Sequence, residues 1–174
     1  MNIEETSIPD IKVCIPTVHK DSRGFFFESF NQQNFVHTFV QDNHSCSAKN
    51  TLRGLHYQIN KPQAKLVRVI RGSILDVAVD IRRSSSTFKQ WVAVKLSSTN
   101  CKQLWIPPGF AHGFIALEHN TEVLYKTTEY WFKEHDRSIK WNDPDLNIQW
   151  RESNVNLSEK DSKAPSLLEA EIFN

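Results

Sequence analysis

Residues 65–81 read KLVRVIRGSILDVAVDI, two apolar runs on either side of Gly72. Both runs are rich in valine, isoleucine and leucine, and the β-branched residues among them favour extended strands. A glycine between two such runs supplies the turn that ends one strand and begins the next. This stretch therefore predicts strands at 65–71 and 73–81.

Similar short runs lie on both sides of this pair. They cover residues 12–16, 91–96, 102–107, 113–117 and 122–128, with polar or turn residues between them. Short strands at regular spacing, without helical periodicity between them, indicate a β-sandwich or barrel. We therefore predict an all-β fold in a single domain that spans residues 1–174.

Helical signal is weak and lies near the two ends of the chain. We expect a short helix within 31–39 and a cap or a single turn at 158–161. The Leu167-Leu168 pair in the C-terminal tail is expected to dock on the domain. The helices of this protein should therefore be short and peripheral.

Composition excludes several classes of protein. The 174 residues are 39% hydrophobic and 24% charged, with a formal net charge of +1, so no electrostatic argument favours nucleic acid or an anionic membrane as a partner. The longest apolar runs of about five residues are far shorter than a membrane span. Three widely spaced cysteines do not suggest a disulfide framework, and the first residues lack a secretory signal pattern. We predict a cytoplasmic protein.

A second stretch, LRGLHYQ at 52–58, places polar side chains in a segment that otherwise looks like a strand. Side-chain alternation is expected to bring Arg53, His56 and Gln58 close together. Gly54 permits a tight backbone approach at the same place. A single histidine in a strand is more often structural than catalytic, so the assignment depends on what else faces the same interior.

Two further basic residues favour a functional site. His112 lies between apolar neighbours in WIPPGFAHGF, residues 105–114, so it is expected to be partly buried and hydrogen-bonded. Lys65 opens a strand that should belong to the core of the barrel. An inward cation needs an anionic partner, either from the protein or from a ligand.

Aromatic residues gather within and just after the last predicted strand. Phe132 is best explained as core packing, whereas Tyr125, Tyr130 and Trp131 combine flat rings with phenolic hydroxyl groups. Such a group can stack on a nucleobase and supply a tyrosine acid.

The PPGFAH run at 107–112 is similar to the second motif of cupin barrels, which often bind a metal. The first cupin motif normally gives two histidines separated by one residue, together with a glutamate. Here the corresponding place reads His56-Tyr57-Gln58, and one histidine of the pair is missing. Two histidines without a third protein ligand make a poor site for a transition metal, so we predict no metal.

Eight motifs in the same order resemble those of the dTDP-4-dehydrorhamnose 3,5-epimerase family. They are DSRGFFFES (21–29), VQDNHS (40–45), LRGLHYQ (52–58), KLVR (65–68), DVAVDIR (76–82), WIPPGFAHGF (105–114), LYKTTEY (124–130) and WNDP (141–144). The resemblance runs from about Ile8 to Leu168, which is nearly the whole chain.

This resemblance implies a cupin-type β-barrel or jelly roll and an enzyme without a cofactor, assembled as a homodimer. The implied reaction inverts C3 and C5 of dTDP-4-keto-6-deoxy-D-glucose and gives dTDP-4-keto-L-rhamnose. It would serve dTDP-L-rhamnose or a related deoxysugar pathway, such as one that supplies lipopolysaccharide O-antigen. By resemblance His56 is the general base, Asp161 is its carboxylate partner and Tyr125 is the general acid. The positions that contact substrate would be Arg23, Glu28, Gln41, Asn43, Arg53, His112, Tyr130, Asp136 and Lys160.

The chemistry explains why these residue types are needed. A C–H bond next to a ketone is weakly acidic because the carbanion delocalises into an enolate, and imidazole titrates in the range suited to removing that proton. A carboxylate on the other ring nitrogen fixes the tautomer and stabilises the imidazolium. The enolate oxygen needs a fixed cation, for which Lys65 is the candidate. Inversion requires the proton to return from the opposite face.

The sequence departs from the family pattern at two places and leaves alternatives open. The common Tyr-Tyr pair is Tyr130-Trp131 here, and Asp136 stands where glutamate is more usual. The alternatives are inversion at C3 or C5 alone, 3,4-keto isomerisation, a metal-dependent cupin dioxygenase, and a sugar-nucleotide binding module without activity. The intact set of His56, Tyr125 and Asp161 argues against simple binding, which needs neither a base nor an acid.

Overall fold

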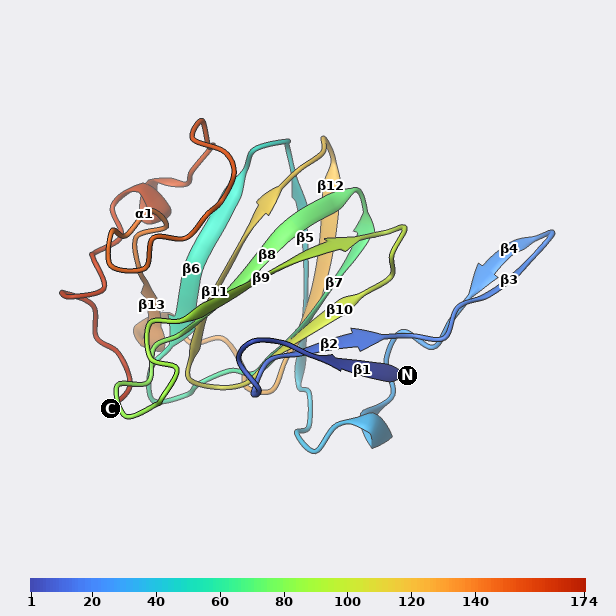
Figure 1. The fold of residues 1–174 in the computed structure, drawn as a ribbon, viewed down its shortest axis with the longest axis horizontal. Coiled ribbons are helices and arrows are strands. Elements are labelled where there is room, and N and C mark those ends of the chain that lie inside the picture. Colours follow the sequence, from blue (N-terminus) through green and yellow to red (C-terminus); the bar gives the residue numbers. More distant parts are fainter.

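A computed structural model describes all residues, 1–174, and shows two antiparallel β-sheets that enclose a common interior (Figure 1). The first sheet has the strand order β1 (Asn2–Glu5), β2 (Lys12–Ile15), β10 (Gln103–Ile106), β7 (Lys65–Arg71), β12 (Thr121–Thr127) and β5 (Gln41–Ser47). The second has the order β13 (Asp136–Ser138), β6 (Leu52–Gln58), β11 (Phe110–Ala116), β8 (Ser73–Asp80) and β9 (Trp91–Ser97). The predicted all-β fold is confirmed.

The two strands first predicted from the sequence belong to different sheets. β7 pairs with β10 and β12, whereas β8 pairs with β9 and β11, so the chain crosses between the sheets at Gly72. Gly72 has a positive φ of 76°, and a Cβ there would lie 2.5 Å from the Thr121 hydroxyl oxygen. Glycine is therefore required at this corner for both backbone conformation and space.

The core has two parts, one on each side of the second sheet. Between the sheets, Val67 and Val123 pack against residues of β8, β9 and β11 such as Ile74. On the other face of the second sheet, Leu75 and neighbouring apolar residues are covered by the segment 139–170. Every residue of β8 is buried for this reason, because both of its faces are covered.

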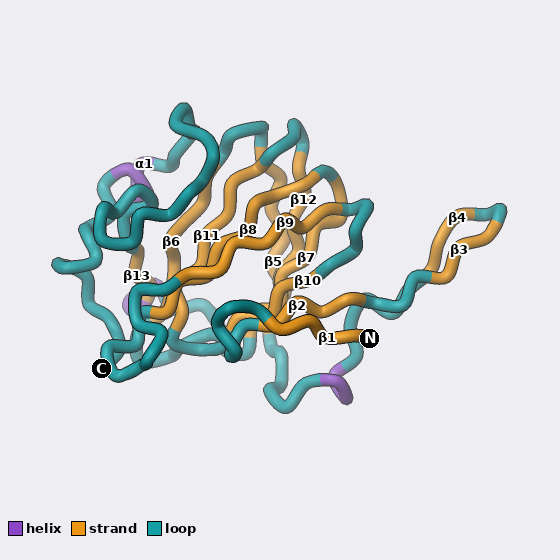
Figure 2. The backbone as a smooth tube through the Cα atoms, in the orientation of Figure 1, coloured by secondary structure: helices purple, strands orange, loops and turns teal.

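Helices are short and peripheral, as Figure 2 shows. They are the 3₁₀ turns η1 (Gln32–Asn34) and η2 (Lys133–His135) and the one-turn helix α1 (Glu159–Ser162). The helix predicted within 31–39 is limited to η1, because the chain is already extended at Phe35 and the aromatic rings of this segment gather on Trp105. None of the helices has the length and apolar character needed to cross a membrane.

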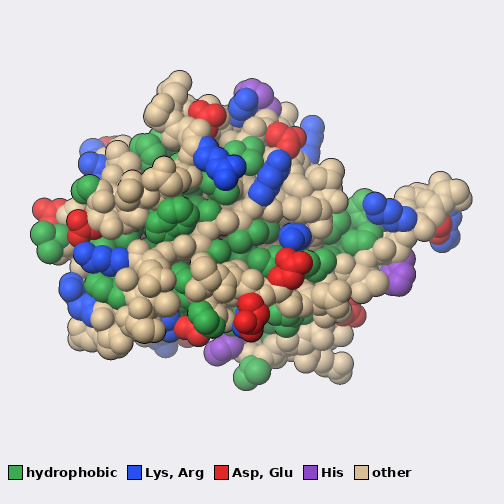
Figure 3. All heavy atoms as spheres, in the orientation of Figure 1, with side chains coloured by type: hydrophobic (Ala, Val, Ile, Leu, Met, Phe, Trp, Pro, Cys, Tyr) green, Lys and Arg blue, Asp and Glu red, His purple; other side chains and the backbone are tan.

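One hairpin extends from the body of the molecule. It consists of β3 (His19–Asp21) and β4 (Gly24–Phe26), which pair only with each other. Figures 1 and 3 show it as an arm that leaves the rest of the chain. The side chains of Phe25 and Phe26 are exposed on it, at 65% and 72%.

Candidate active site

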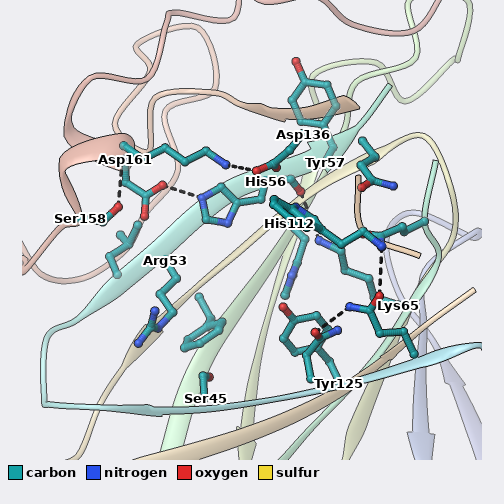
Figure 4. A pocket seen from close by; sticks show the side chains of 18 of the residues that line it. Ser45, Arg53, His56, Tyr57, Lys65, His112, Tyr125, Asp136, Ser158 and Asp161 are labelled. Carbon is teal, nitrogen blue, oxygen red and sulfur yellow. Dashed lines mark hydrogen bonds and ion pairs between the residues drawn. The ribbon is translucent and has the colours of Figure 1, made fainter. Parts of the chain in front are cut away.

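A cavity of about 480 Å³ lies between the two sheets, within the size range of small-ligand sites. Ten of the thirteen residues predicted for the site line it. They are Gln41, Asn43, Arg53, His56, Lys65, His112, Tyr125, Asp136, Lys160 and Asp161. Residues from both sheets and from α1 therefore meet in one place (Figure 4).

Arg53 and His56 both face this cavity because β6 contains a bulge. Simple alternation would send residues three apart to opposite faces of a strand. The pairing of β6 with β11 shifts register here, with His56 opposite His112 but Arg53 opposite Phe114. The extra residue in β6 turns Arg53 back to the face of His56. The expectation that the two lie together holds, although alternation alone does not explain it.

Glycine makes the bulge possible. Gly54 has a φ of 132°, and a Cβ there would lie 2.5 Å from Gly113 Cα and 2.8 Å from the His112 carbonyl oxygen. Such contacts are too short for any side chain, so the two strands can approach this closely only with glycine at Gly54. The close approach places His56 and His112 side by side on neighbouring strands.

His56 and Asp161 form a hydrogen-bonded pair at the wall of the cavity. His56 Nε2 lies 2.5 Å from Asp161 Oδ1, although the two residues are 105 positions apart in sequence. Burial alone would raise the pKa of the Asp161 carboxyl, but hydrogen bonding and charge from His56 hold this pKa below its usual value. The carboxylate is thus the acceptor, and His56 donates the proton on Nε2. Its Nδ1 keeps a lone pair that can accept a proton from a ligand.

The C-terminal segment carries Asp161 to this position through backbone contacts. It pairs with the start of β6 through a parallel bridge between Thr51 and Asn156. The Ser158 hydroxyl then accepts the Asp161 backbone N–H at 3.1 Å and caps α1. Beyond α1, the buried Asp143 accepts the Leu167 backbone N–H at 2.7 Å. The docking expected of the Leu167-Leu168 pair is thus confirmed for Leu167 alone, because Leu168 is 86% exposed.

Lys65 and His112 lie deep in the cavity. Lys65 Nζ donates to the His56 carbonyl oxygen at 3.3 Å, and burial lowers the pKa of this amine to about 8 against the opposing charges of Asp76 and Asp136. Burial also lowers the pKa of His112, while its hydrogen-bond partner Asp76 opposes that change. The cavity therefore contains a basic floor that can face a developing negative charge.

Tyr125 comes from the opposite sheet. It lies on β12 beside Asn43 of β5, and Figure 4 shows its ring across the cavity from His56 and Asp161. Burial raises the pKa of the phenol, so Tyr125 is protonated at neutral pH and can donate a proton. The base candidate and the acid candidate thus stand on different sheets, with space for a ligand between them.

Polar and charged residues continue from this floor toward the opening. Arg53 Nε donates to the Ser47 hydroxyl at 3.1 Å, which orients the guanidinium at the cavity. Lys160 of α1 pairs with Asp136 of β13 at 2.5 Å, so the shorter aspartate is still in reach of the lysine. Gln41 donates to Asn43 at 2.9 Å. These groups can bind a ligand that combines an anion with polar rings.

Of the neighbouring aromatic residues Tyr130 and Trp131, Trp131 lines the cavity and Tyr130 does not. Two glutamines hold this loop by its backbone: Gln41 accepts the Trp131 N–H at 3.0 Å, and Gln58 accepts the Phe132 N–H at 2.6 Å. Gln58 also donates to the Tyr130 carbonyl oxygen at 3.0 Å, so it acts as a clamp for the loop. The backbone bonds made by both glutamines are not visible in the sequence, which shows only neighbouring aromatic residues.

Besides Tyr130, two predicted contact residues lie outside the cavity of their own chain. Arg23 is at the exposed tip of the β3–β4 hairpin and pairs with Asp21 at 2.6 Å, with 88% of its side chain exposed. Glu28 accepts the Asn31 amide at 3.2 Å. Nothing in the single chain brings either residue to His56, because the hairpin extends away from the body (Figure 3).

Comparison with known proteins agrees with this architecture. The profile of the dTDP-4-dehydrorhamnose 3,5-epimerase family matches residues 5–169. An enzyme of that name from Pseudomonas aeruginosa is 51% identical over 180 aligned residues, which cover 99% of each chain. The crystal structure of a dTDP-6-deoxy-D-glucose-3,5-epimerase from Legionella pneumophila, in complex with dTDP-4-keto-L-rhamnose, is similar with a TM-score of 0.94. Its sequence is 47% identical, and the match covers 97% of this chain and 93% of that one.

A less similar solved structure is that of an enzyme named for epimerisation at a single carbon. It is a 3'-monoepimerase from Streptomyces bikiniensis in complex with dTDP-quinovose, with a TM-score of 0.88 and 31% identity over 94% of this chain and 87% of that one. The fold thus accommodates epimerases that are named for one centre or for two. Because the family profile and the relatives cover nearly the whole chain, this chain belongs to the dTDP-4-dehydrorhamnose 3,5-epimerase family.

Proposed function

We propose that this protein converts dTDP-4-keto-6-deoxy-D-glucose to dTDP-4-keto-L-rhamnose by inverting C3 and C5. The observation that carries the proposal is the His56–Asp161 pair, which faces Tyr125 across a cavity floored by Lys65. A base with an orienting carboxylate, a cation and an acid on the far side are the groups that an inversion next to a ketone needs. A cytoplasmic location stays a prediction.

The first step is proton removal. His56 Nδ1 takes the proton from the carbon next to the C4 ketone, and the C–H electron pair moves into an enolate. Asp161 stabilises the imidazolium that forms and keeps its ring in place. Lys65, as an ammonium ion, faces the negative oxygen of the enolate, and this interaction is strong in a buried site. No electron is gained or lost, so the reaction needs no redox partner.

The second step returns a proton from the other face. Tyr125 donates its phenolic proton to the enolate carbon, and the C4 ketone forms again with the carbon inverted. Proton exchange with solvent then restores neutral His56 and the Tyr125 phenol. The same pair of groups serves C3 and C5 in turn, because both carbons are adjacent to the same ketone.

The outer part of the cavity suits the nucleotide. The Arg53 guanidinium and the Lys160 ammonium are the cations for the diphosphate, and arginine is geometrically suited to phosphate oxygens. Among the aromatic residues predicted to stack on the base, Trp131 lines the cavity and provides the flat ring. Gln41 and Asn43 supply amide groups between these two regions.

Inversion of both centres is the preferred reaction. The relative from Pseudomonas aeruginosa, named a 3,5-epimerase, is 51% identical, whereas the 3'-monoepimerase is 31% identical. This difference supports the double reaction.

Deuterium exchange tests the proposal directly. The wild-type protein is incubated with dTDP-4-keto-6-deoxyglucose in D₂O, and NMR follows the sugar. We expect deuterium to enter the sugar at both C3 and C5. The rate should be the same with EDTA, because His56 and His112 each direct one ring nitrogen to a carboxylate, and no group of three or more His, Cys, Asp or Glu residues is placed to hold a metal.

Each other outcome selects a different function. Exchange at one carbon means a single-centre epimerase, and movement of the keto group from C4 to C3 means a keto isomerase. Loss of activity in EDTA that added metal restores means a metal-dependent cupin. Tight binding of the nucleotide sugar without exchange or reaction means a binding module and contradicts the proposal.

We also propose that the protein is a homodimer in which the β3–β4 hairpin of each protomer covers the cavity of the other. The exposed Phe25 and Phe26 rings on this arm would be buried in such a contact. Arg23 and Glu28, which the family resemblance assigns to substrate, would then reach a substrate held by the partner's residues. Closed two-fold dimers are the commonest assemblies of soluble proteins.

Mixing two inactive proteins tests this arrangement. Arg23→Ala and His56→Asn are each expected to be nearly inactive alone. After the two are unfolded together and refolded at equal amounts, mixed dimers carry one cavity with both His56 and an intact partner arm. Activity should return to about a quarter of the wild-type level for random pairing. If Arg23 acted in its own cavity, the mixture would be no more active than its components.

A further inference from the structure

Asp76 is a carboxylate in the interior of the barrel for which the mechanism above gives no role. It lies on β8 between Ile74 and Ala78, and none of its surface is exposed. A charged group in such a place is unfavourable unless hydrogen bonds or opposite charges compensate for the lost water.

The hydrogen bonds of Asp76 differ from those of the other buried aspartates. Asp80 accepts bonds from Arg82, Ser85 and Thr87. Asp143 accepts three backbone N–H groups. By contrast, Asp76 Oδ1 accepts one bond from His112 Nε2 at 2.7 Å, and its Oδ2 is buried without a hydrogen-bond partner. Asp80 and Asp143 are explained by the turns they hold, and Asp76 is not.

The surroundings of Asp76 contain the basic floor of the cavity. His112 is 6% exposed and Lys65 is 8% exposed, and both line the cavity. Lys65 Nζ makes a single hydrogen bond, to the His56 carbonyl oxygen, and no carboxylate lies within ion-pair distance of it. The charge of Asp76 acts on both basic groups, and in each case it favours the protonated form.

We propose that Asp76 is a positioning residue that orients His112 and supplies the negative charge that keeps Lys65 a cation. Because Asp76 accepts the proton on His112 Nε2, Nδ1 is the His112 ring nitrogen left for a ligand. Because the carboxylate lies behind the floor, it stabilises the ammonium without occupying the place of the substrate oxygen. This inference rests on the proposed function, in which Lys65 stabilises the enolate.

The titratable groups around Lys65 and His112 come from five elements. They are His56 on β6, Asp76 on β8, Tyr125 on β12, Asp136 on β13, and Lys160 and Asp161 on α1. Burial is the main cause that lowers the pKa of Lys65, Asp76 and Asp136 raise it, Lys160 lowers it, and the net result is a pKa of about 8. Removal of the Asp76 charge should therefore lower this pKa and deprotonate Lys65 at a lower pH.

The test is Asp76→Asn, which removes the charge but keeps an oxygen that can accept from His112. In a plot of kcat against pH, the wild-type curve should have an alkaline limb, where kcat falls as Lys65 loses its proton near pH 8. In Asp76→Asn this limb should move to lower pH by about one unit. The kcat should drop about fivefold at pH 8 and about tenfold at higher pH, with little change in KM, because the lost interaction belongs to the enolate.

Asp80→Asn is the matched control. It removes a buried carboxylate from the same strand, four residues away, and should lower thermal stability without moving the alkaline limb. If Asp76→Asn leaves the limb in place, or if both variants change it equally, Asp76 is merely structural and the proposal is overturned.

A measurement on the wild-type protein covers the case in which Asp76→Asn does not fold. ¹⁵N NMR of labelled histidine should show that His112 carries its proton on Nε2. The signal of the unprotonated Nδ1 should stay unchanged until a ligand binds. A proton on Nδ1 alone would contradict the orientation by Asp76. The NMR result does not depend on turnover, so failure of the proposed function, seen as no exchange in wild type, is distinguishable from failure of this inference.

Discussion

The His56→Asn protein is expected to lose almost all exchange of the substrate's C3 and C5 hydrogens with solvent. Asparagine can still form a hydrogen bond with Asp161, but it has no basic nitrogen to accept a proton from carbon. A positioned general base typically contributes ~10²–10⁴-fold, so the exchange rate should fall by about 10³-fold. NMR in D₂O measures this rate, and isothermal calorimetry with the nucleotide sugar should show that binding is largely retained.

His44→Asn is the control for this substitution. His44 is also on a strand and also pairs with a carboxylate, Glu122, at 3.1 Å, but it lies outside the cavity with half of its side chain exposed. Its replacement should leave exchange unchanged. Near-normal turnover of His56→Asn would contradict the mechanism, since no other group is hydrogen-bonded to Asp161 in a position to act as the base.

Most of the strands were predictable because their residues satisfy two conditions at once. In β7 and β12, β-branched residues are frequent and turn residues stand at the ends, so composition and length agree. The short strands β1, β3, β4 and β13 lack this signal, since they are three or four mostly exposed or half-exposed residues defined by their partners. The sequence also did not predict which strand belongs to which sheet. A glycine such as Gly72, where the chain crosses from one sheet to the other, looks the same in a sequence as a glycine in a hairpin turn.

The site depends on contacts that no local pattern contains. That Asp161 contacts His56 was expected only from family resemblance, and the structure confirms the contact through a segment whose course is fixed by Asn156, Ser158 and Leu167. Arg53 shares the face of His56 because of a bulge that alternation does not predict. The Trp131 position follows from hydrogen bonds between its loop backbone and glutamine side chains, and no sequence pattern marks such bonds.

The sequence match predicts a role for Arg23 and Glu28 that the fold of one chain does not explain. The family resemblance assigns them to a ligand, but within the single chain neither residue lines the cavity. Their exposed positions fit the proposed homodimer, in which the cavity of a second copy would supply that ligand. The same consideration applies to Phe25 and Phe26, whose exposure is unfavourable in an isolated protomer.

The Tyr125→Phe protein is expected to exchange substrate hydrogens but to invert them poorly. His56, Asp161 and Lys65 remain, so the enolate should still form at a rate within about tenfold of wild type. Without the phenol, the deuteron returns from His56 on the face it left, and the carbon regains its original configuration. Inversion should fall by about 10²–10⁴-fold, and the ratio of exchange to inversion, followed by NMR in D₂O, should rise accordingly.

Tyr57→Phe separates this effect from the general loss of a phenol. The Tyr57 hydroxyl donates to the Glu171 carbonyl oxygen at 2.6 Å, and its ring packs in the part of the core that the segment 139–170 covers. This variant should be less stable, but its ratio of exchange to inversion should equal that of wild type. If Tyr125→Phe inverts at the normal rate, another group delivers the proton. If it loses exchange as completely as His56→Asn, Tyr125 takes part in proton removal and the division of labour between the two sheets is wrong.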